Sequence, residues 1–564
     1  MKTTGPVPLR ETPDPYGAYP RLSEAQIEIL SDHGVRRHTR PGDVLYREGD
    51  LTCDFYVVLD GKVMIVEGYG EEERLLSVHG PGRFLGELNL LTGQAVFTTA
   101  VVSEPGEVLS VPAVRLREIV GQDPALGDLI LRACLIRRSI LIGLGTGFRI
   151  VGSRYSPDTR RLREFAARNR LPHRWIDLEE DKGAEALLRR LGVSPEETPV
   201  VIWRGREVLR NPSNAELARA LGLPAPSPCE EAHDLIIVGA GPAGLAASVY
   251  GASEGLRTVA LDAVATGGQA GASSRIENYL GFPSGLSGAE LADRAVIQAE
   301  KFGARISVPA QAGALEEIDG LYAVRLDDGT TILGHTVVIA TGARYRRLPV
   351  PRLEEFEGVS VYYAATLMEA QFCQGDPVAV VGGGNSAGQA AVFMAEHSAR
   401  VRLLVRSGDL GKNMSRYLVD HILNNRRIEV MLHTEVRELI GEGGTLRALV
   451  IEDNRTGERR RVDARALFVF IGAKPCTRWL EGRLAVDEDG FILTGSAADS
   501  AGEAMPAPAE RARLPLETSR PGVFAAGDVR KGSIKRVASA VGEGSMAIRL
   551  VHEHLQGVRE PVLS

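Results

Sequence analysis

Three glycines and one aspartate in this sequence have the types and the spacing of a dinucleotide-binding site. Gly239, Gly241 and Gly244 form a Gly-x-Gly-x-x-Gly pattern directly after the apolar run 235–238 and directly before a helical pattern. The first glycine permits a tight turn, the second lets the backbone approach a pyrophosphate, and the third lets helix and strand pack closely. The helix N-terminus then faces the phosphate charge. Asp262 ends a second apolar run about 20 residues later, where an acid would bind a ribose hydroxyl.

A second glycine pattern, Gly382-x-Gly384-x-x-Ala387, also follows an apolar strand and opens a helix. Counting 21 residues from Gly241 reaches Asp262, and the same count from Gly384 reaches Val405. Valine cannot bind a ribose hydroxyl, but Arg406 follows it, and a guanidinium suits a 2′-phosphate. The sequence therefore favours NADPH over NADH at this site. Two dinucleotide sites in one chain imply two cofactors, one passing electrons to the other.

These sites need several folded units to position them, and the chain of 564 residues is long enough for three or four. Hydrophobic content of 44% and charged content of 25% are typical of a soluble globular protein. A net charge of −7 gives no indication of a nucleic-acid partner. No apolar run is long enough for a membrane span and residues 1–20 lack a signal-peptide core, so we expect a cytoplasmic protein. The five cysteines are widely separated, so no metal site is predicted.

Residues 1–145 alternate short strands with turns and then become helical from about residue 112. Segments 40–50, 56–62 and 84–91 resemble the cyclic-nucleotide-binding domain family, whose β-barrel we expect here. The resemblance implies that Gly86 donates backbone N–H groups to a cyclic phosphate and that Glu87 binds the ribose. Val96 stands where the family has a phosphate-binding arginine, which costs about 1.5–3 kcal/mol of binding. Cyclic nucleotide binding, another ligand, and a purely structural or docking role therefore remain open.

Residues 146–224 predict the element order β-α-β-α-β-β-α, which is similar to the thioredoxin and glutaredoxin family. Ser156 and Thr159 stand where that family has its Cys-x-x-Cys, and hydroxyls cannot form a disulfide. Ser156 is better interpreted as a helix cap with Pro157 at the first helical position. The unit is expected to be an adaptor or a remnant, followed by a stiff proline-rich linker, 223–228.

Together with segments 337–343, 468–475, 522–528 and 535–544, the two glycine patterns resemble the thioredoxin-reductase branch of the FAD-dependent pyridine-nucleotide oxidoreductases. The resemblance implies two Rossmann-like α/β domains and a homodimer. One domain, 230–345 with 467–558, binds FAD, and the other, 350–465, binds NADPH. The residues implied for FAD, besides the three glycines and the aspartate of the first site, are Gly268, Gln269, Asn278, Thr341, Gly342, Gly527, Asp528, Val537 and Ala538. Those implied for NADPH are Gly382, Gly384, Asn385, Ser386, Ala387 and Arg406.

The resemblance fails at the redox disulfide. Thioredoxin reductases carry a Cys-x-x-Cys after a Gly-Val-Ser, but here Tyr362 and Ala365 hold those positions and Cys373 lies alone further on. We therefore expect hydride transfer from NADPH to FAD and then directly to an acceptor, protein or small molecule, with regulation by the N-terminal domain. One alternative is a thioredoxin-disulfide reductase that uses an external thiol or Cys373. Another is a flavin-dependent sensor or scaffold. No side chain is assigned as a catalytic acid or base.

Overall fold

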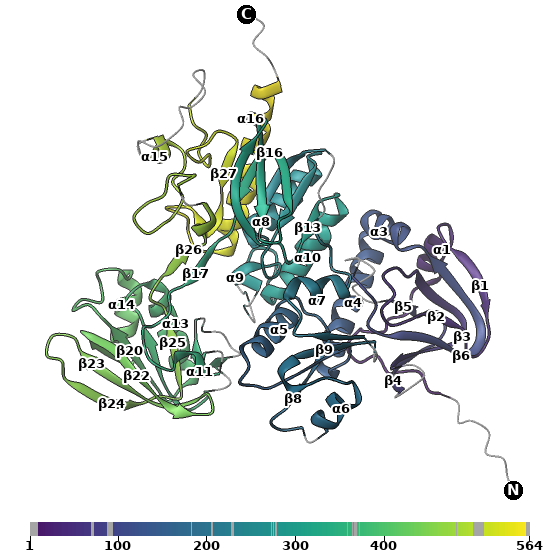
Figure 1. Ribbon diagram of the computed structural model, residues 1–564, viewed down its shortest axis with the longest axis horizontal. Coiled ribbons are helices and arrows are strands. Elements are labelled where there is room, and N and C mark those ends of the chain that lie inside the picture. The colour runs from purple at the N-terminus through teal and green to yellow at the C-terminus, as the bar shows by residue number, and fades with distance from the viewer. Residues whose placement is uncertain are drawn as a thin grey trace, which may run out of the picture.

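The computed structural model describes residues 9–68, 73–86, 94–181, 183–204, 207–226, 231–271, 273, 276, 279–357, 359–363, 365, 369–370, 373–480, 482–499 and 512–559. The chain folds into four units (Figure 1). We call them the front unit, the small unit, the first Rossmann unit and the second Rossmann unit, in chain order. Within the described residues, no helix is both long and apolar enough to cross a membrane.

The front unit is an antiparallel sheet followed by two helices. Its strands run in the order β1-β6-β3-β4, with β2 on β6 and β5 on β3. Within the described residues this pairing does not close, so the barrel expected from the sequence is an open sheet. The elements are α1 (Glu24–Ser31), β1 (Val35–Thr39), β2 (Val44–Tyr46), β3 (Phe55–Glu67), β4 (Arg74–His79), β5 (Phe84–Leu85), β6 (Thr99–Val111), α3 (Ala113–Gln122) and α4 (Pro124–Leu144).

The small unit has the element order that the sequence predicts. Its sheet runs β10-β9-β7-β8, with β7 and β8 parallel and the other pairs antiparallel. Ser156 caps the first helix by accepting a hydrogen bond from the Thr159 N–H at 3.3 Å, and Pro157 opens the helix. The Thr198–Pro199 peptide bond is cis. The elements are β7 (Phe148–Gly152), α5 (Pro157–Arg168), β8 (His173–Asp177), α6 (Ala184–Arg190), the 3₁₀ turn Pro195–Glu197, β9 (Val200–Trp203), β10 (Glu207–Arg210) and α7 (Asn214–Ala220).

The front and small units share one hydrophobic core. Ala95 and Phe97 of the front unit are buried in the cluster that contains Phe148 and Trp203 of the small unit. The rings of Phe97 and Trp203 pack edge to face, 5.4 Å apart between centroids. The Ala95 N–H also donates to the Leu221 carbonyl at 3.1 Å. The two units therefore pack as one body.

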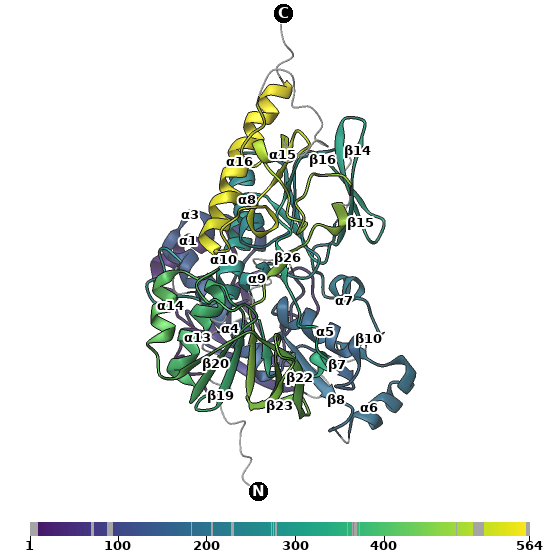
Figure 2. The ribbon, with the colours of Figure 1, turned by 90° about the vertical axis from the view of Figure 1, so that its left-hand side faces the viewer.

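The first Rossmann unit is a mixed sheet in the order β13-β12-β11-β16-β15-β14, with β27 also paired to β16. Helix α16 packs beside α8 over this sheet (Figure 2). Its elements are β11 (His233–Val238), α8 (Pro242–Ser253), β12 (Thr258–Leu261), α9 (Gly268–Gly271), α10 (Gly288–Lys301), β13 (Arg305–Ser307), β14 (Ala312–Ile318), β15 (Leu321–Leu326), β16 (Thr331–Ile339), the 3₁₀ turn Arg478–Leu480, α15 (Ser496–Asp499), β27 (Val523–Ala525), the 3₁₀ turn Gly527–Val529 and α16 (Val537–Arg559).

The second Rossmann unit is a parallel sheet in the order β18-β25-β19-β20-β21 and an antiparallel sheet β22-β23-β24. A two-stranded neck, in which β17 (Ala343–Tyr345) pairs with β26 (Ala473–Pro475), joins it to the first Rossmann unit (Figure 1). Its elements are α11 (Leu353–Phe356), β18 (Val361–Tyr362), β19 (Pro377–Val381), α13 (Asn385–His397), β20 (Arg400–Val405), α14 (Arg416–Leu423), β21 (Ile428–Leu432), β22 (Thr434–Glu442), β23 (Thr445–Asp453), β24 (Arg459–Asp463) and β25 (Ala466–Val469).

Candidate dinucleotide sites

The first glycine turn, between β11 and α8, is too crowded for side chains at two of its three glycines. Gly239 has φ +107°, and a Cβ there would lie 2.2 Å from the Ala340 carbonyl oxygen. A Cβ on Gly244 would lie 1.7 Å from the Gly239 carbonyl oxygen, so helix and turn touch directly. Gly241 caps α8, and a Cβ there would lie 3.7 Å from the Gly268 Cα, which is an ordinary van der Waals contact. The turn thus presents the helix N-terminus without a covering side chain, as a pyrophosphate requires.

Asp262 lies directly after β12, and its carboxylate accepts hydrogen bonds from the turn and from its own loop. One oxygen accepts from the Ala240 N–H at 2.8 Å, and the other accepts from Val264 at 2.9 Å and Ala265 at 3.1 Å. Burial raises the pKa of Asp262, and these three N–H donors oppose the rise. The oxygen that accepts from Ala240 keeps a lone pair for a hydroxyl group. The structure therefore brings Asp262 to the glycine turn, as the 21-residue count predicts.

Two of the predicted cofactor residues, Gly268 and Gln269, lie in the short helix α9, beside the first turn. A Cβ on Gly268 would lie 3.0 Å from the Gly241 Cα, and the Gln269 side chain is exposed. Asn278 falls outside the described residues. Thr341 and Gly342 precede the neck, where the Thr341 hydroxyl donates to the Cys476 carbonyl at 2.9 Å.

Gly527 and Asp528 lie beside the first turn of α8. A Cβ on Gly527 would lie 3.0 Å from the Ala243 Cβ, and the Gly527 N–H donates to Glu543 at 2.7 Å. Burial raises the pKa of Asp528, while the charge of Lys535 opposes the rise and that of Glu543 adds to it. Val537 and Ala538 form the first turn of α16, with Ala538 exposed. The described residues predicted for the first cofactor therefore gather around the N-terminal end of α8 and the start of the neck.

The second glycine turn, between β19 and α13, repeats the first with one change. Gly382 has φ +146°, and a Cβ there would lie 2.3 Å from the Phe470 carbonyl oxygen. Ala387 is buried beneath the turn, where the first turn has a glycine. Gly384 caps α13, and the exposed residues Asn385 and Ser386 form its first turn.

In the second Rossmann unit, Val405 stands at the position that corresponds to Asp262 and Arg406 follows it. These two side chains differ in their exposure to solvent. Val405 is 1% exposed and packs under the turn, since a Cβ on Gly383 would lie 3.2 Å from its Cγ1. Arg406 follows β20 with an exposed side chain, and no ion pair joins it to a described residue. The cation is therefore available at the edge of the turn, where a phosphate on the ribose would need it.

The loop 407–415, which we did not single out in the sequence, completes the second turn. Asn413 forms a parallel bridge with Gly384, and the Asn385 side chain accepts a hydrogen bond from the Ser415 N–H at 2.7 Å. Lys412 adds an exposed cation to the same loop. This loop could have been found from its position in the sequence. Its glycine, asparagine and serine residues directly follow a parallel strand, and α/β sheets bind ligands at the edge where such strands end.

The described cysteines lie apart from one another and include no disulfide. Cys373 is 2% exposed in the core of the second Rossmann unit, and burial raises the pKa of its thiol to about 11. Cys476 lies at the end of the neck, and burial raises the pKa of its thiol while Arg344 opposes the rise. Cys53 is partly exposed and Cys134 is buried, both in the front unit. Within the described residues, no group of three or more His, Cys, Asp or Glu could hold a metal ion.

Among the described residues, the Arg137 side chain occupies part of the site predicted in the front unit. The Arg137 guanidinium donates to the carbonyls of Gly86 at 2.8 Å, Phe84 at 3.1 Å and Ala18 at 2.6 Å. The cavity that adjoins Gly86 has a volume of about 40 Å³, whereas small-molecule pockets have about 300–1,000 Å³. Glu87 falls outside the described residues. Val96, at the position of the missing arginine, is 2% exposed and packs in the front unit's core.

Comparison with known proteins gives matches for two parts of the chain, the two Rossmann units and the front unit. The family model described as pyridine nucleotide-disulphide oxidoreductase matches residues 233–544, and that described as cyclic nucleotide-binding domain matches residues 36–123. Thioredoxin reductase of Bacillus subtilis is 31% identical over 332 residues, which cover 59% of this chain and 97% of the relative. A 34.2 kDa protein in the rubredoxin operon of Clostridium pasteurianum is 30% identical over 336 residues, which cover 58% and 99%.

A crystal structure of T. acidophilum thioredoxin reductase is 28% identical, with a TM-score of 0.48 and coverage of 58% of this chain and 100% of that one. The family match spans more than half of the 564 residues and includes both glycine turns. The thioredoxin reductase family uses FAD and NADPH. The chain therefore belongs to the pyridine nucleotide-disulphide oxidoreductase family, as a thioredoxin-reductase-like, FAD-dependent NAD(P)H enzyme with an N-terminal cyclic nucleotide-binding domain.

Proposed function

We propose that this protein oxidises NADPH through FAD and passes the electrons directly to an acceptor, without a disulfide of its own. The single observation that carries the proposal is the residue pair at the family's disulfide position, Tyr362 and Ala365, neither of which contains sulfur. When bound, FAD supplies the chemistry of accepting a hydride and releasing its electrons in pairs or singly. Acceptors of either kind, a redox protein or a small molecule such as a quinone or oxygen, therefore fit the proposal.

The first Rossmann unit has the features that FAD requires, so we propose it as the FAD domain, residues 230–345 and 467–558. Gly241, the N-cap of α8, would lie against the pyrophosphate, and Asp262 would bind the adenosine ribose. The other residues proposed to contact FAD are Gly239, Gly244, Gly268, Gln269, Asn278, Thr341, Gly342, Gly527, Asp528, Val537 and Ala538.

The second Rossmann unit, residues 350–465, is proposed as the NADPH domain. Arg406 would bind the 2′-phosphate, because its guanidinium is exposed and no acid in the described residues pairs with it. The other residues proposed to contact NADPH are Gly382, Gly384, Asn385, Ser386 and Ala387, with Lys412 added from the loop after β20. Residues 1–145 and 146–224 are proposed as the cyclic-nucleotide-binding-like and thioredoxin-like domains.

Cys373 is a poor substitute for the missing disulfide. Thiol–disulfide exchange requires a thiolate that an oxidised partner can reach. The Cys373 thiol is buried, its pKa is raised to about 11, and its Sγ donates to the Glu369 carbonyl at 3.1 Å. These features support direct transfer over the thioredoxin-reductase alternative that uses this cysteine.

A stopped-flow measurement tests the proposal on the purified, flavin-loaded protein. NADPH should bleach the flavin, and the variant Cys373→Ser should turn over with quinone or a one-electron acceptor as fast as the wild type. Thioredoxin-linked thiol production that Cys373→Ser abolishes would contradict direct transfer. Flavin that NADPH fails to reduce would contradict the assignment of the two sites.

We also propose that the front and small units regulate the FAD domain, because the small unit contacts the loop that carries Asp262. The Asn169 side chain donates to the Val264 carbonyl at 2.9 Å, across the boundary between the two units. Arg170 pairs with Asp293 on α10, and the Arg170 carbonyl accepts from Arg138 of the front unit at 3.2 Å. Three units thus meet at one residue close to the proposed ribose site.

A second contact supports regulation at the neck. Tyr345 of β17 stacks on Tyr363, with centroids 6.0 Å apart and planes 8° apart, and the Tyr363 hydroxyl donates to Glu357 at 2.6 Å. Burial raises the pKa of Glu357, but bonds from Arg347 and Tyr363 and the charges of Arg347 and Arg160 lower it below its usual value. Arg160 belongs to α5, so the small unit acts electrostatically on the acid that holds this side of the neck.

The role of the front unit as a cyclic nucleotide receptor is less well supported than a docking role. Arg137 occupies the carbonyls beside Gly86, and Phe97, directly after Val96, lies in the core shared with the small unit. The segment that holds phosphate in the resembling family is therefore used here to attach the next unit. Equilibrium dialysis with cyclic AMP and cyclic GMP tests this proposal, and saturable binding of either would contradict it.

A further inference from the structure

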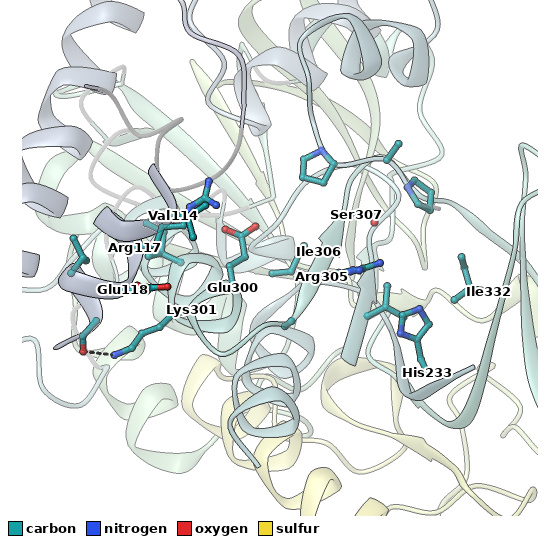
Figure 3. A pocket seen from close by; sticks show the side chains of 18 of the residues that line it. Val114, Arg117, Glu118, His233, Glu300, Lys301, Arg305, Ile306, Ser307 and Ile332 are labelled. Carbon is teal, nitrogen blue, oxygen red and sulfur yellow. Dashed lines mark hydrogen bonds between the residues drawn. The ribbon is translucent and has the colours of Figure 1, made fainter. Parts of the chain in front are cut away.

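A cavity of about 660 Å³ lies at the seam between the front unit and the first Rossmann unit, away from both glycine turns (Figure 3). Its walls come from α3, from the linker 224–226, and from α10 with β13. Its volume falls within the range of small-molecule sites, and unit boundaries are among the places where such sites occur. We call it the seam cavity.

One end of the seam cavity contains polar groups from both units. The Lys301 ammonium donates to the Gly121 carbonyl at 3.0 Å, which joins α10 to the last turn of α3 (Figure 3). Burial raises the pKa of Glu300 to about 8, and the charge of Arg117 opposes the rise. At neutral pH the Glu300 carboxyl is therefore largely protonated and adds little negative charge. The other acid there, Glu118, is paired with Arg115 at 2.7 Å.

The other end of the seam cavity also has a cation. Arg305 lies on β13 with an exposed side chain, and no ion pair joins it to a described residue. Burial lowers the pKa of His233, and the charge of Arg305 lowers it further, so the imidazole is neutral at pH 7. Figure 3 shows Arg305, Ser307 and His233 together, separated from the Arg117 end. This end therefore carries the net positive charge of one guanidinium.

Between the two ends the walls are apolar. Ile306 lies between the polar groups in Figure 3. The apolar residues that line the cavity include Val114, Val120, Pro224, Val259, Ile297 and Ile306. A ligand that covered these side chains would gain about 25 cal/mol for each Å² of apolar surface removed from water.

We propose that the seam cavity binds a small amphipathic organic anion, with its acidic group at Arg305 and its apolar body along Ile297 and Ile306. An uncharged ligand would leave the guanidinium without a partner, and a cation would be repelled by it. A fully hydrophilic anion would leave the apolar walls uncovered. A carboxylate, sulfonate or phosphate on an aromatic or short aliphatic body satisfies both requirements.

Helix α10 connects the seam cavity to the segment beside the proposed flavin site. Ile297, Glu300 and Lys301 belong to the last turns of α10, while Gly288 opens the same helix at α9. A Cβ on Gly288 would lie 1.7 Å from the Ala270 carbonyl oxygen, so the helix is in direct contact with the segment 267–271. A ligand that binds differently to two positions of α10 would therefore shift that segment as well.

The test uses two dyes with the same aromatic body on the full-length protein. 8-Anilinonaphthalene-1-sulfonate carries the anionic group, and N-phenyl-1-naphthylamine lacks it. Fluorescence titration should give saturable binding of the sulfonate that is tighter than binding of the neutral dye. Arg305→Gln should weaken the sulfonate about tenfold or more, as expected for loss of a charge-assisted hydrogen bond, and leave the neutral dye unchanged.

Two further variants locate the site. Ala225→Trp places an indole in the cavity from the exposed linker, so both dyes should lose saturable binding. Arg325→Gln removes an arginine on β15 that pairs with Glu316 instead of lining the cavity, and should bind both dyes like the wild type. Sulfonate binding that survives Arg305→Gln and Ala225→Trp would overturn the proposal, as would the absence of saturable binding to the wild type.

Discussion

The contact between Asn169 and Val264 predicts that the small unit contributes to FAD affinity. The Asn169 amide makes two hydrogen bonds, to the Phe165 carbonyl of its own helix and to the Val264 carbonyl of the first Rossmann unit, both at 2.9 Å. Asn169→Ala removes both, but only the second holds the loop on which Asp262 accepts the Val264 N–H. One neutral hydrogen bond contributes about 1 kcal/mol. FAD should therefore bind about fivefold more weakly to the variant.

The assay is the recovery of flavin fluorescence as FAD dissociates, measured over a range of protein concentrations. ADP and FMN separate the two halves of the cofactor: because Asp262 is placed to bind the adenosine ribose, ADP should weaken with FAD while FMN should not. Asn214→Ala is the matched control, since among the described residues that side chain accepts a hydrogen bond from Arg161 alone, within the small unit. If Asn169→Ala binds FAD and ADP within about twofold of both the wild type and Asn214→Ala, the proposed coupling is refuted.

Three other changes test separate parts of the structure. Arg406→Gln should raise the KM for NADPH at least tenfold and leave NADH nearly unchanged, because only NADPH carries the phosphate; equal losses for both nucleotides, or a similar effect of Arg416→Gln, would contradict this. Glu300 has a pKa of about 8 in the folded protein against an ordinary value of 4.5, so the folded state binds the extra proton between these values. Stability should then fall as pH rises from about 5 to 8, by at most about 1.4 kcal/mol per unit, and Glu300→Gln should flatten that slope in thermal unfolding. Phe97→Ala should cost about 3–5 kcal/mol and lower the unfolding temperature of the front and small units together, which differential scanning calorimetry can resolve.

The sequence predicted the two Rossmann units well because their turns depend on residue type at fixed spacing. Gly239 and Gly382 have positive φ values and no room for a Cβ, so each must be glycine. Such positions can be identified from the local sequence, without knowing which distant residues they contact. Asp262 and Val405 could be compared by counting, since both units have the same order of strand, glycine turn, helix and parallel strand. The capping role of Ser156 was predictable for the same reason: it depends on the next three residues.

Contacts between units could not be predicted in this way. Nothing in the residues around Asn169 indicates that its amide reaches Val264, 95 positions along the chain. The loop 407–415 was missed because its backbone, through Asn413 and Ser415, touches the second turn, and backbone contacts leave little trace in residue type. The expected barrel of the front unit depended on how its first and last strands meet, which alternation of polar and apolar residues does not specify.

Because one core contains both Phe97 and Trp203, the boundary near residue 145 does not separate two independently packed domains. A cut there would separate the two halves of one hydrophobic cluster and expose each to water, although the chain between them is a single glycine-containing turn. We therefore expect the first 224 residues to unfold as one cooperative unit. A ligand or partner that binds the front unit would therefore act on the first Rossmann unit through the front and small units moving together as one rigid body.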